Sequence, residues 1–203
     1  MAYNKEIKLV TLSGPAGAGK TTMMEMFLAF PRSFKVIESY TTRPKRAEEK
    51  DAGSKSEYVF ISEKDFEQLV QKESFAWYVT YDGHYYGTLK KSLKEALDAK
   101  HISVMILTPE TVADLREQIK MLGGNPRENI VSFFIWAPED DLRLRMAWRG
   151  DNRISIKERL SLVSYQNKKS KELDLIRIKN SNKERPPEVF QKMHEYLLSS
   201  PQA

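Results

Sequence analysis

The stretch Gly14-Pro15-Ala16-Gly17-Ala18-Gly19-Lys20-Thr21 decides which fold this chain can adopt. It satisfies the pattern G-x-x-x-x-G-K-[ST], whose glycines let backbone N–H groups turn inward around phosphate oxygens. A β-branched, apolar run at 7–12 predicts a buried strand, and apolar residues at helical spacing follow from 20 to 30. Because a strand precedes the loop and a helix follows it, the pattern indicates a phosphate-binding loop rather than a chance glycine-rich turn. We therefore expect the chain to bind a nucleoside triphosphate.

The residue types in this loop indicate how the triphosphate would be held. The ammonium of Lys20 is expected to reach the β- and γ-phosphates, and the hydroxyl of Thr21 suits a Mg²⁺ ligand. The positive end of the following helix would face the same oxygens. The expected triphosphate-binding residues are Gly14, Ala16, Gly17, Ala18, Gly19, Lys20, Thr21 and Thr22.

Further along the chain, short apolar runs alternate with helical patterns. The strand patterns lie at 102–107, 130–136 and 177–180, and the helical patterns at 89–99, 112–122, 139–148, 154–171 and 187–198. Such alternation predicts an α/β fold with a parallel sheet flanked by helices on both faces.

The stretch 39–88 interrupts this alternation. It is polar and basic at its start, has a strand pattern at 58–61, and carries Ser62 where it can cap a helix over 63–72. Aromatic residues around Asp82-Gly83 indicate a hairpin. We therefore expect a core made of residues 1–38 and 89–203, into which 39–88 is inserted as a separate lobe.

Composition narrows the function classes. The 203 residues are 40% hydrophobic and 30% charged, which suits one globular unit with an inserted subdomain. With no cysteine, a disulfide scaffold, a thiolate metal site and cysteine catalysis are excluded. No apolar run is long enough to span a bilayer, and the first strand leaves no room for a signal peptide, so we expect a cytoplasmic protein without membrane association. The net charge of +5 favours an anionic partner.

A second group of basic and hydroxyl residues follows the phosphate loop. It begins with Ser39-Tyr40-Thr41-Thr42-Arg43-Pro44-Lys45-Arg46 and continues with Tyr58-Val59-Phe60 and Gly83-His84-Tyr85-Tyr86-Gly87-Thr88. Two arginines three residues apart can clamp a phosphate dianion through paired N–H donors, which lysine does less well. A lone pair of this kind would more simply be a solvated basic loop, but here it stands among other ordered motifs.

The ordered set of motifs resembles the guanylate kinase family of nucleoside-monophosphate kinases. The resemblance spans the chain and includes R-L-R-M-x-x-R-G at 143–150, followed by Arg159. It implies a P-loop NTPase core, an inserted monophosphate-binding lobe at 39–88 and a helical lid at about 139–160. It also implies ATP-dependent phosphoryl transfer to a nucleoside monophosphate, with GMP or dGMP the usual acceptor and ATP and Mg²⁺ as cofactors.

The resemblance assigns roles to individual positions. By this resemblance the acceptor is held by Ser39, Arg43, Arg46, Tyr58, Tyr86 and Thr88, and the lid arginines are Arg145, Arg149 and Arg159. Phosphoryl transfer depends mainly on positioning and on positive charge at the equatorial oxygens. We therefore expect Lys20, Arg43, Arg149 and Arg159 to be catalytic, and Arg145 to contact ATP.

The chain departs from the family at the positions that read guanine. The family's glutamate before G-x-Y-Y-G is replaced by Trp77, and its D-x-D motif is replaced by Ile106 and Thr108, with Glu110 two residues beyond. The residues expected to bind the acceptor phosphate are thus kept, while those expected to hydrogen-bond the base are changed. We expect Trp77 and Thr108 to be acceptor-binding residues. Trp77, Tyr78 and Tyr81 are expected either to stack on or wall in the base, or to pack as core of the lobe.

Alternatives follow from these departures. The acceptor could be a pyrimidine or modified deoxynucleotide, or ribose 1,5-bisphosphate. A different class is a guanylate-kinase-like phosphopeptide-binding module, but such modules have degraded phosphate loops, whereas residues 14–21 are intact. No nucleic-acid-binding motif is present, and two nucleotides account for the arginines. We expect only small-molecule nucleotide partners and a monomer or homodimer.

Overall fold

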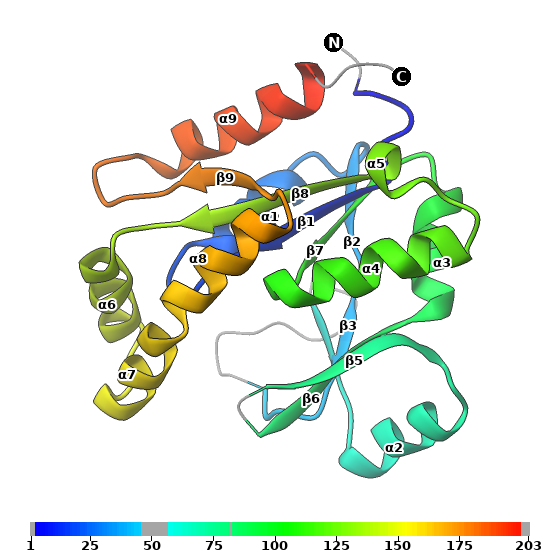
Figure 1. Ribbon diagram of the computed structural model, residues 1–203, viewed down its shortest axis with the longest axis horizontal. Helices are drawn as coiled ribbons and strands as arrows, with labels where there is room; N and C mark the ends of the chain where they lie inside the picture. The colour runs from blue at the N-terminus through cyan, green and yellow to red at the C-terminus, as the bar shows by residue number, and fades with distance from the viewer. Residues whose placement is uncertain (1–2, 46–56, 82, 200–203) are drawn as a thin grey trace.

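The computed structural model describes residues 3–45, 57–81 and 83–199. They form two sheets, of which the larger is parallel with strand order β2-β7-β1-β8-β9 (Figure 1). Its strands are β1 (Leu9–Ser13), β2 (Phe34–Val36), β7 (Ile102–Ile106), β8 (Ile130–Trp136) and β9 (Ile176–Lys179). The predicted α/β class with a parallel, helix-flanked sheet is confirmed.

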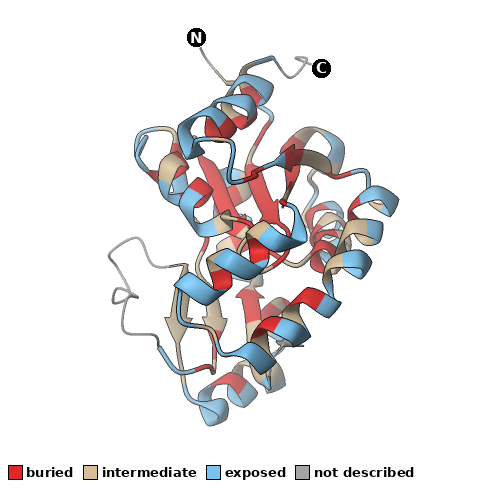
Figure 2. Ribbon diagram, turned by 90° about the vertical axis from the view of Figure 1, so that its left-hand side faces the viewer, coloured by how far each residue is buried: buried red, intermediate tan, exposed pale blue. Residues whose placement is uncertain are grey.

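Helices cover both faces of this sheet because its strands are apolar on both sides. Successive side chains of β1 alternate, so that Val10 and Leu12 pack in one cluster and Leu9 in another. The first cluster includes residues of α1 (Lys20–Leu28) and α9 (Pro186–Ser199), and the second includes residues of α3 (Lys90–Asp98) and α4 (Pro109–Met121). Figure 2 shows the buried strands at the centre and exposed outer faces on the helices. No helix in the described ranges has both the length and the apolar character to cross a bilayer.

The smaller sheet has the order β4-β3-β6-β5 and lies at the bottom of Figure 1. Its strands are β3 (Ser39–Thr41), β4 (Tyr58–Phe60), β5 (Phe75–Tyr81) and β6 (His84–Leu89), and the helix α2 (Glu63–Gln71) lies between β4 and β5 in sequence. The predicted cap is confirmed, since the Ser62 hydroxyl accepts the Asp65 N–H at 3.1 Å. The aromatic ring of Phe66 on α2 packs against Phe75 and Tyr85, so α2 covers one face of this sheet.

A β-bulge in β5 determines which side chains lie on the face of the smaller sheet opposite α2. Between Phe75 and Trp77 the register with β6 shifts, so these two side chains face opposite sides. Phe75 lies over Gly87, where an added Cβ would come within 2.7 Å of the ring. Trp77 stands in register with Thr88 on the face opposite α2. That face also carries Ser39, Tyr58 and Tyr86.

Three features differ from the sequence prediction. The single helix expected over 154–171 is two helices, α7 (Arg153–Ser161) and α8 (Val163–Glu172). They separate at Leu162, whose N–H bonds to the Arg159 carbonyl three residues back, while its dihedral angles stay helical. The strand β2 and the short helix α5 (Pro126–Asn129) were not predicted. Both are too short to show a periodic pattern.

Candidate active site

The phosphate loop leaves the carboxyl end of β1 in a conformation that only glycine tolerates. Gly14 has φ +139°, and an added Cβ would lie 2.0 Å from the Ile135 carbonyl oxygen of β8. Gly19, the N-cap of α1, has φ +93°, and its Cβ would lie 2.5 Å from Asn180 Nδ2. Because Gly19 has no side chain to cap the helix, the first N–H groups of α1 are left for a ligand.

Lys20 folds back over the loop. Its ammonium donates to the carbonyl oxygens of Gly14 at 2.7 Å and Pro15 at 2.9 Å. Burial lowers the pKa of Lys20 from 10.5 to about 8; Glu57 opposes this effect, and Arg149 and Arg159 add to it. These charges therefore converge on one place, where the arginines' positive field favours an anion.

Side chains from the opposite end of the chain brace the same loop. Asn180 Nδ2, at the end of β9, donates to the Ala18 carbonyl at 2.7 Å. Arg145, on α6 (Glu139–Trp148), donates to the carbonyls of Gly17 at 3.2 Å and Asn180 at 2.8 Å, and to Asn182 Oδ1 at 2.9 Å. Arg145 was expected to contact ATP; in this structure it holds the backbone of the phosphate loop.

The other two arginines that were expected in a lid meet at one carboxylate. Arg149 Nη2 lies 2.5 Å and Arg159 Nη1 lies 2.8 Å from the same oxygen, Asp151 Oδ2. Arg149 ends α6 and Arg159 lies on α7, so the Asp151 turn joins the two helices at the site. Asp151 was not among the expected site residues.

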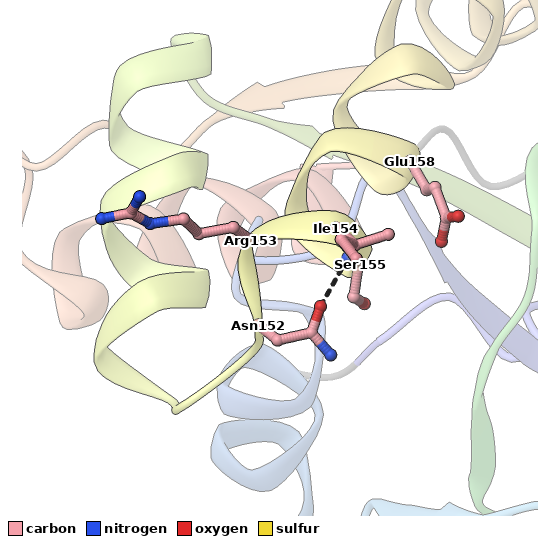
Figure 3. Close-up of a pocket in the computed structure, with 5 residues that line it drawn as sticks. All are labelled: Asn152, Arg153, Ile154, Ser155 and Glu158. Carbon is pink, nitrogen blue, oxygen red and sulfur yellow. Dashed lines mark hydrogen bonds between the residues drawn. The ribbon is translucent and has the colours of Figure 1, made fainter.

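A hollow of about 580 Å³ lies beside this turn. Figure 3 shows its lining at the start of α7, where Asn152 caps the helix by accepting the Ser155 N–H at 2.9 Å and Arg153 and Glu158 extend in opposite directions. The lining residues are Asn152, Arg153, Ile154, Ser155 and Glu158. None of them is an expected site residue, and most are exposed, so this hollow lies on the solvent side of α7.

Of the expected acceptor residues, Ser39, Tyr58, Tyr86 and Thr88 lie on one face of the smaller sheet, and Arg43 follows β3. Arg43 is buried, and its guanidinium stacks over the rings of Tyr58, 4.8 Å from the centroid, and Phe60, 5.1 Å away. Tyr58 packs edge-on against Tyr86 at 5.9 Å. Arg46 lies outside the described residues.

At the other end of this face, hydroxyl groups gather. Ser39 Oγ and Thr88 Oγ1 lie 3.2 Å apart. Thr108 is not on this sheet: it precedes α4 and pairs with Thr111 through their hydroxyls at 2.9 Å. A surface with arginine at one end and hydroxyls at the other can hold a phosphate and a polar group at a fixed separation.

The residues that were expected near the acceptor base do not all face this surface. Trp77 is only 8% exposed and packs with Leu107 and Val112 in a core cluster of the larger sheet, not in a core of the lobe itself. Glu110 faces α8 instead: Glu172 chiefly, and Glu110 more weakly, raise the pKa of Lys169. Trp77 and Ile106 thus place an indole and an aliphatic side chain at two positions where the resemblance would put carboxylates.

The donor set at Thr21 suits Mg²⁺. Thr21 is exposed in the first turn of α1, beside Lys20. Within the described ranges no three histidine or acidic side chains cluster as a metal cage. Mg²⁺ in nucleotide sites needs only one or two protein oxygens besides phosphates, so a single hydroxyl fits.

Comparison with known proteins decides the family. The guanylate kinase family model matches residues 6–195. The chain belongs to the guanylate kinase family. Members of this family are nucleoside-monophosphate kinases, that is, phosphotransferases.

Relatives within the guanylate kinase family span most of the chain. The guanylate kinase of Chlamydia caviae is 32% identical over 195 residues, covering 95% of this chain and 86% of its own length. That of Neisseria gonorrhoeae is 30% identical over 177 residues, covering 86% and 80%. The crystal structure of guanylate kinase from Anaplasma phagocytophilum superposes with a TM-score of 0.70 at 20% identity, covering 96% of this chain and 86% of that one. This last likeness supports the fold.

Three side chains at the site were missed by sequence reasoning: Glu57, Asp151 and Asn180. Asp151 stood in the Arg149–Arg153 turn, where a carboxylate among arginines was a usable signal. Glu57 directly precedes the Tyr58 motif. Nothing local marked Asn180, since its partner Ala18 lies 162 residues away.

Proposed function

We propose that this protein transfers the γ-phosphoryl group of ATP to a nucleoside monophosphate, giving ADP and the nucleoside diphosphate, with GMP or dGMP as acceptor. The observation that carries this proposal is the phosphate loop with the Lys20 ammonium folded over it, while the charges of Arg149 and Arg159 act on the pKa of the same ammonium. Phosphoryl transfer asks for positive charge around the moving group and little covalent chemistry.

On the ATP side, the loop residues 14–22 supply backbone donors and the Lys20 ammonium. Lys20 would exchange its two carbonyl partners for phosphate oxygens. Mg²⁺, held by Thr21 and the phosphates, supplies further charge neutralisation. Arg145 would hold the loop in shape for ATP.

On the acceptor side, we propose that 39–88 acts as the monophosphate-binding lobe and about 139–160 as the lid. Arg43 and Arg46, with the hydroxyls of Tyr58 and Tyr86, would bind the acceptor phosphate. Ser39, Thr88 and Thr108 would lie toward the base, with Trp77 packed behind them. The stacking of Arg43 on two rings supports this, because it fixes the orientation of the planar guanidinium and its N–H donors before a ligand binds.

Replacing Arg43 with lysine tests the acceptor site. Lysine keeps the charge but loses the planar fork and the ring stacking. We expect the KM for the acceptor to rise about 10- to 100-fold, the loss of a charge-assisted bidentate contact, while the KM for ATP stays within about twofold. Steady-state kinetics with each substrate varied in turn measures both, and Arg127→Lys on the far side of the core is the control. A raised KM for ATP with an unchanged acceptor KM would contradict the assignment.

The pKa of Lys20 predicts the pH dependence. The ammonium binds phosphate only when protonated, and in the free protein it loses its proton above a pKa of about 8. We therefore expect kcat/KM for ATP to fall as the pH rises through about 8. Bound phosphate stabilises the ammonium, so the fall in kcat should come at higher pH. A flat kcat/KM profile over about two units above pH 8 would contradict this.

The same shift has a consequence for stability. Because the folded pKa of Lys20 lies below its unfolded value of 10.5, the unfolded chain binds more protons between the two. The free energy of unfolding contributed by Lys20 therefore rises as pH increases from about 8 to 10.5.

The identity of the acceptor is tested by a panel. ATP consumption with Mg²⁺ is measured for all ribo- and deoxyribonucleoside monophosphates, 5-substituted pyrimidine nucleotides and ribose 1,5-bisphosphate. Turnover with GMP or dGMP alone supports the proposal and assigns guanine reading to groups such as Thr88 and Thr108. Turnover with another acceptor would support the kinase activity but change the acceptor that we propose. Absence of ATP consumption with every acceptor in the panel would favour the phosphopeptide-binding alternative.

We also propose that the protein acts in the cytoplasm, where its nucleotide substrates are, as a monomer or homodimer without nucleic acid. Size-exclusion chromatography with light scattering distinguishes the two states. A larger assembly would contradict this part of the proposal.

A further inference from the structure

The turn between α6 and α7 is built to fix one carboxylate. Gly150, with φ +87°, ends α6 by donating its N–H to the Ala147 carbonyl at 3.0 Å, while the Asp151 N–H bonds to the Met146 carbonyl at 3.1 Å. This pair of bonds is a Schellman motif, which holds the backbone of Asp151 rigidly to the end of α6. Asn152 then caps α7. Asp151 therefore sits between two anchored helix ends.

This carboxylate lies between two guanidinium groups. Asp151 and Arg159 are each 16% exposed and Arg149 is 38% exposed, so the pair with Arg159 is the better shielded from water. Both arginines lie close enough to Lys20 to act on it. Three positive groups near one point repel one another, and a shared carboxylate offsets that repulsion.

We propose that Asp151 is a positioning residue that holds Arg149 and Arg159 side by side, facing the phosphate loop, before nucleotide binds. This inference rests on the proposed function, in which the two arginines neutralise the transferring phosphoryl group. A guanidinium has five N–H donors, more than one carboxylate can engage, so an arginine held by Asp151 can still donate to phosphate oxygens. Holding both in place avoids ordering two long side chains at the transition state.

The test is Asp151→Asn, which keeps the size of the side chain and removes its charge. We expect kcat to fall about 10- to 100-fold, the cost of misplaced catalytic groups. The KM for ATP should stay the same or fall, because one negative charge near the phosphates is gone. A structural defect would instead weaken ATP binding as well. Asp140→Asn, an exposed acid on α6 of the same lid, is the matched control and should leave both parameters unchanged.

Two further variants distinguish positioning of the arginines from a general role in folding. If Asp151 acts through the arginines, Asp151→Asn should add little to the loss already caused by Arg149→Ala together with Arg159→Ala. Asp151→Glu restores the charge and should recover part of kcat, with thermal unfolding showing that each variant is folded. Unchanged or increased kcat in Asp151→Asn, or a full additional loss in the arginine-free background, would overturn the proposal.

A measurement without turnover separates this inference from the proposed function. The N–H groups that donate to Asp151, Nε–H of Arg149 and Nη1–H of Arg159, are followed by NMR and assigned with the two Arg→Lys variants. We expect protection from solvent exchange in the parent protein and its loss in Asp151→Asn. Absence of turnover in the parent protein would overturn the proposed function alone, and equal exchange in the two proteins would overturn the role of Asp151.

Discussion

Lys20→Ala abolishes phosphoryl transfer in our expectation, with kcat/KM for ATP at least about 10³-fold lower, or about 4 kcal/mol of transition-state stabilisation. The ammonium is the only charged side chain that the phosphate loop itself supplies, and it already lies 2.7 Å from the Gly14 carbonyl inside the loop. Alanine leaves the backbone donors but removes the charge that faces the β- and γ-phosphates. Coupled measurement of ADP release with saturating acceptor gives the loss.

The fold should survive this change. A buried ammonium with a lowered pKa is a cost to the folded state, so Lys20→Ala should unfold at the same temperature as the parent protein or higher. Lys91→Ala, an exposed lysine on α3, is the control and should keep full activity. Residual transfer within about tenfold of the parent would show that the loop does not hold the reacting phosphates.

Arg149→Ala is expected to lower kcat and kcat/KM together, by about 10³-fold, as for arginines that neutralise a transferring phosphoryl group. Arg149 ends α6 and reaches the site beside Arg159, so its guanidinium is placed to bind charge that develops on the γ-phosphoryl oxygens. Single-turnover measurements separate the chemical step from product release. A rise in KM with kcat unchanged would assign Arg149 to ground-state binding instead.

The matched control for this variant is Arg143→Ala. Arg143 lies on the same helix, and its guanidinium pairs with Glu139 at 2.9 Å on the exposed side. An exposed pair of this kind contributes little to stability, so this change should leave activity and folding almost unaltered. Equal losses in the two variants would show that the lid tolerates no substitution, and would contradict a specific role for Arg149.

Much of the fold follows from periodicity in the sequence. The strand β8 and the helix α6 begin and end at their predicted residues, 130–136 and 139–148, because each combines a clear apolar pattern with a proline or a turn at its edge. The strand β2, three residues long, carries too few residues for any period to appear. The break at Leu162 was not predicted because it is slight. The dihedral angles of Leu162 remain helical, and the break consists of one N–H that bonds three residues back instead of four.

The residues of the candidate site likewise fall into those that local motifs predict and those that depend on contacts distant in sequence. Motif residues such as Lys20 and Arg43 were found because a fixed spacing serves a fixed chemistry. Asn180 braces the loop across 162 residues, and such a contact depends on the sheet order that brings β9 beside β8. Trp77 could be placed on its strand from the sequence, but whether its indole faced a ligand or the core depended on the bulge beside it.

The position of β1 between β7 and β8 determines how slowly its amide protons exchange with solvent. Every residue of β1 is buried, and both of its edges are paired, so its amide protons meet solvent only when the whole sheet opens. The phosphate loop is therefore tethered to the slowest-exchanging part of the chain. The turn that carries Asp151 lies outside the sheet, between α6 and α7, so its amide protons can exchange without the opening of β1.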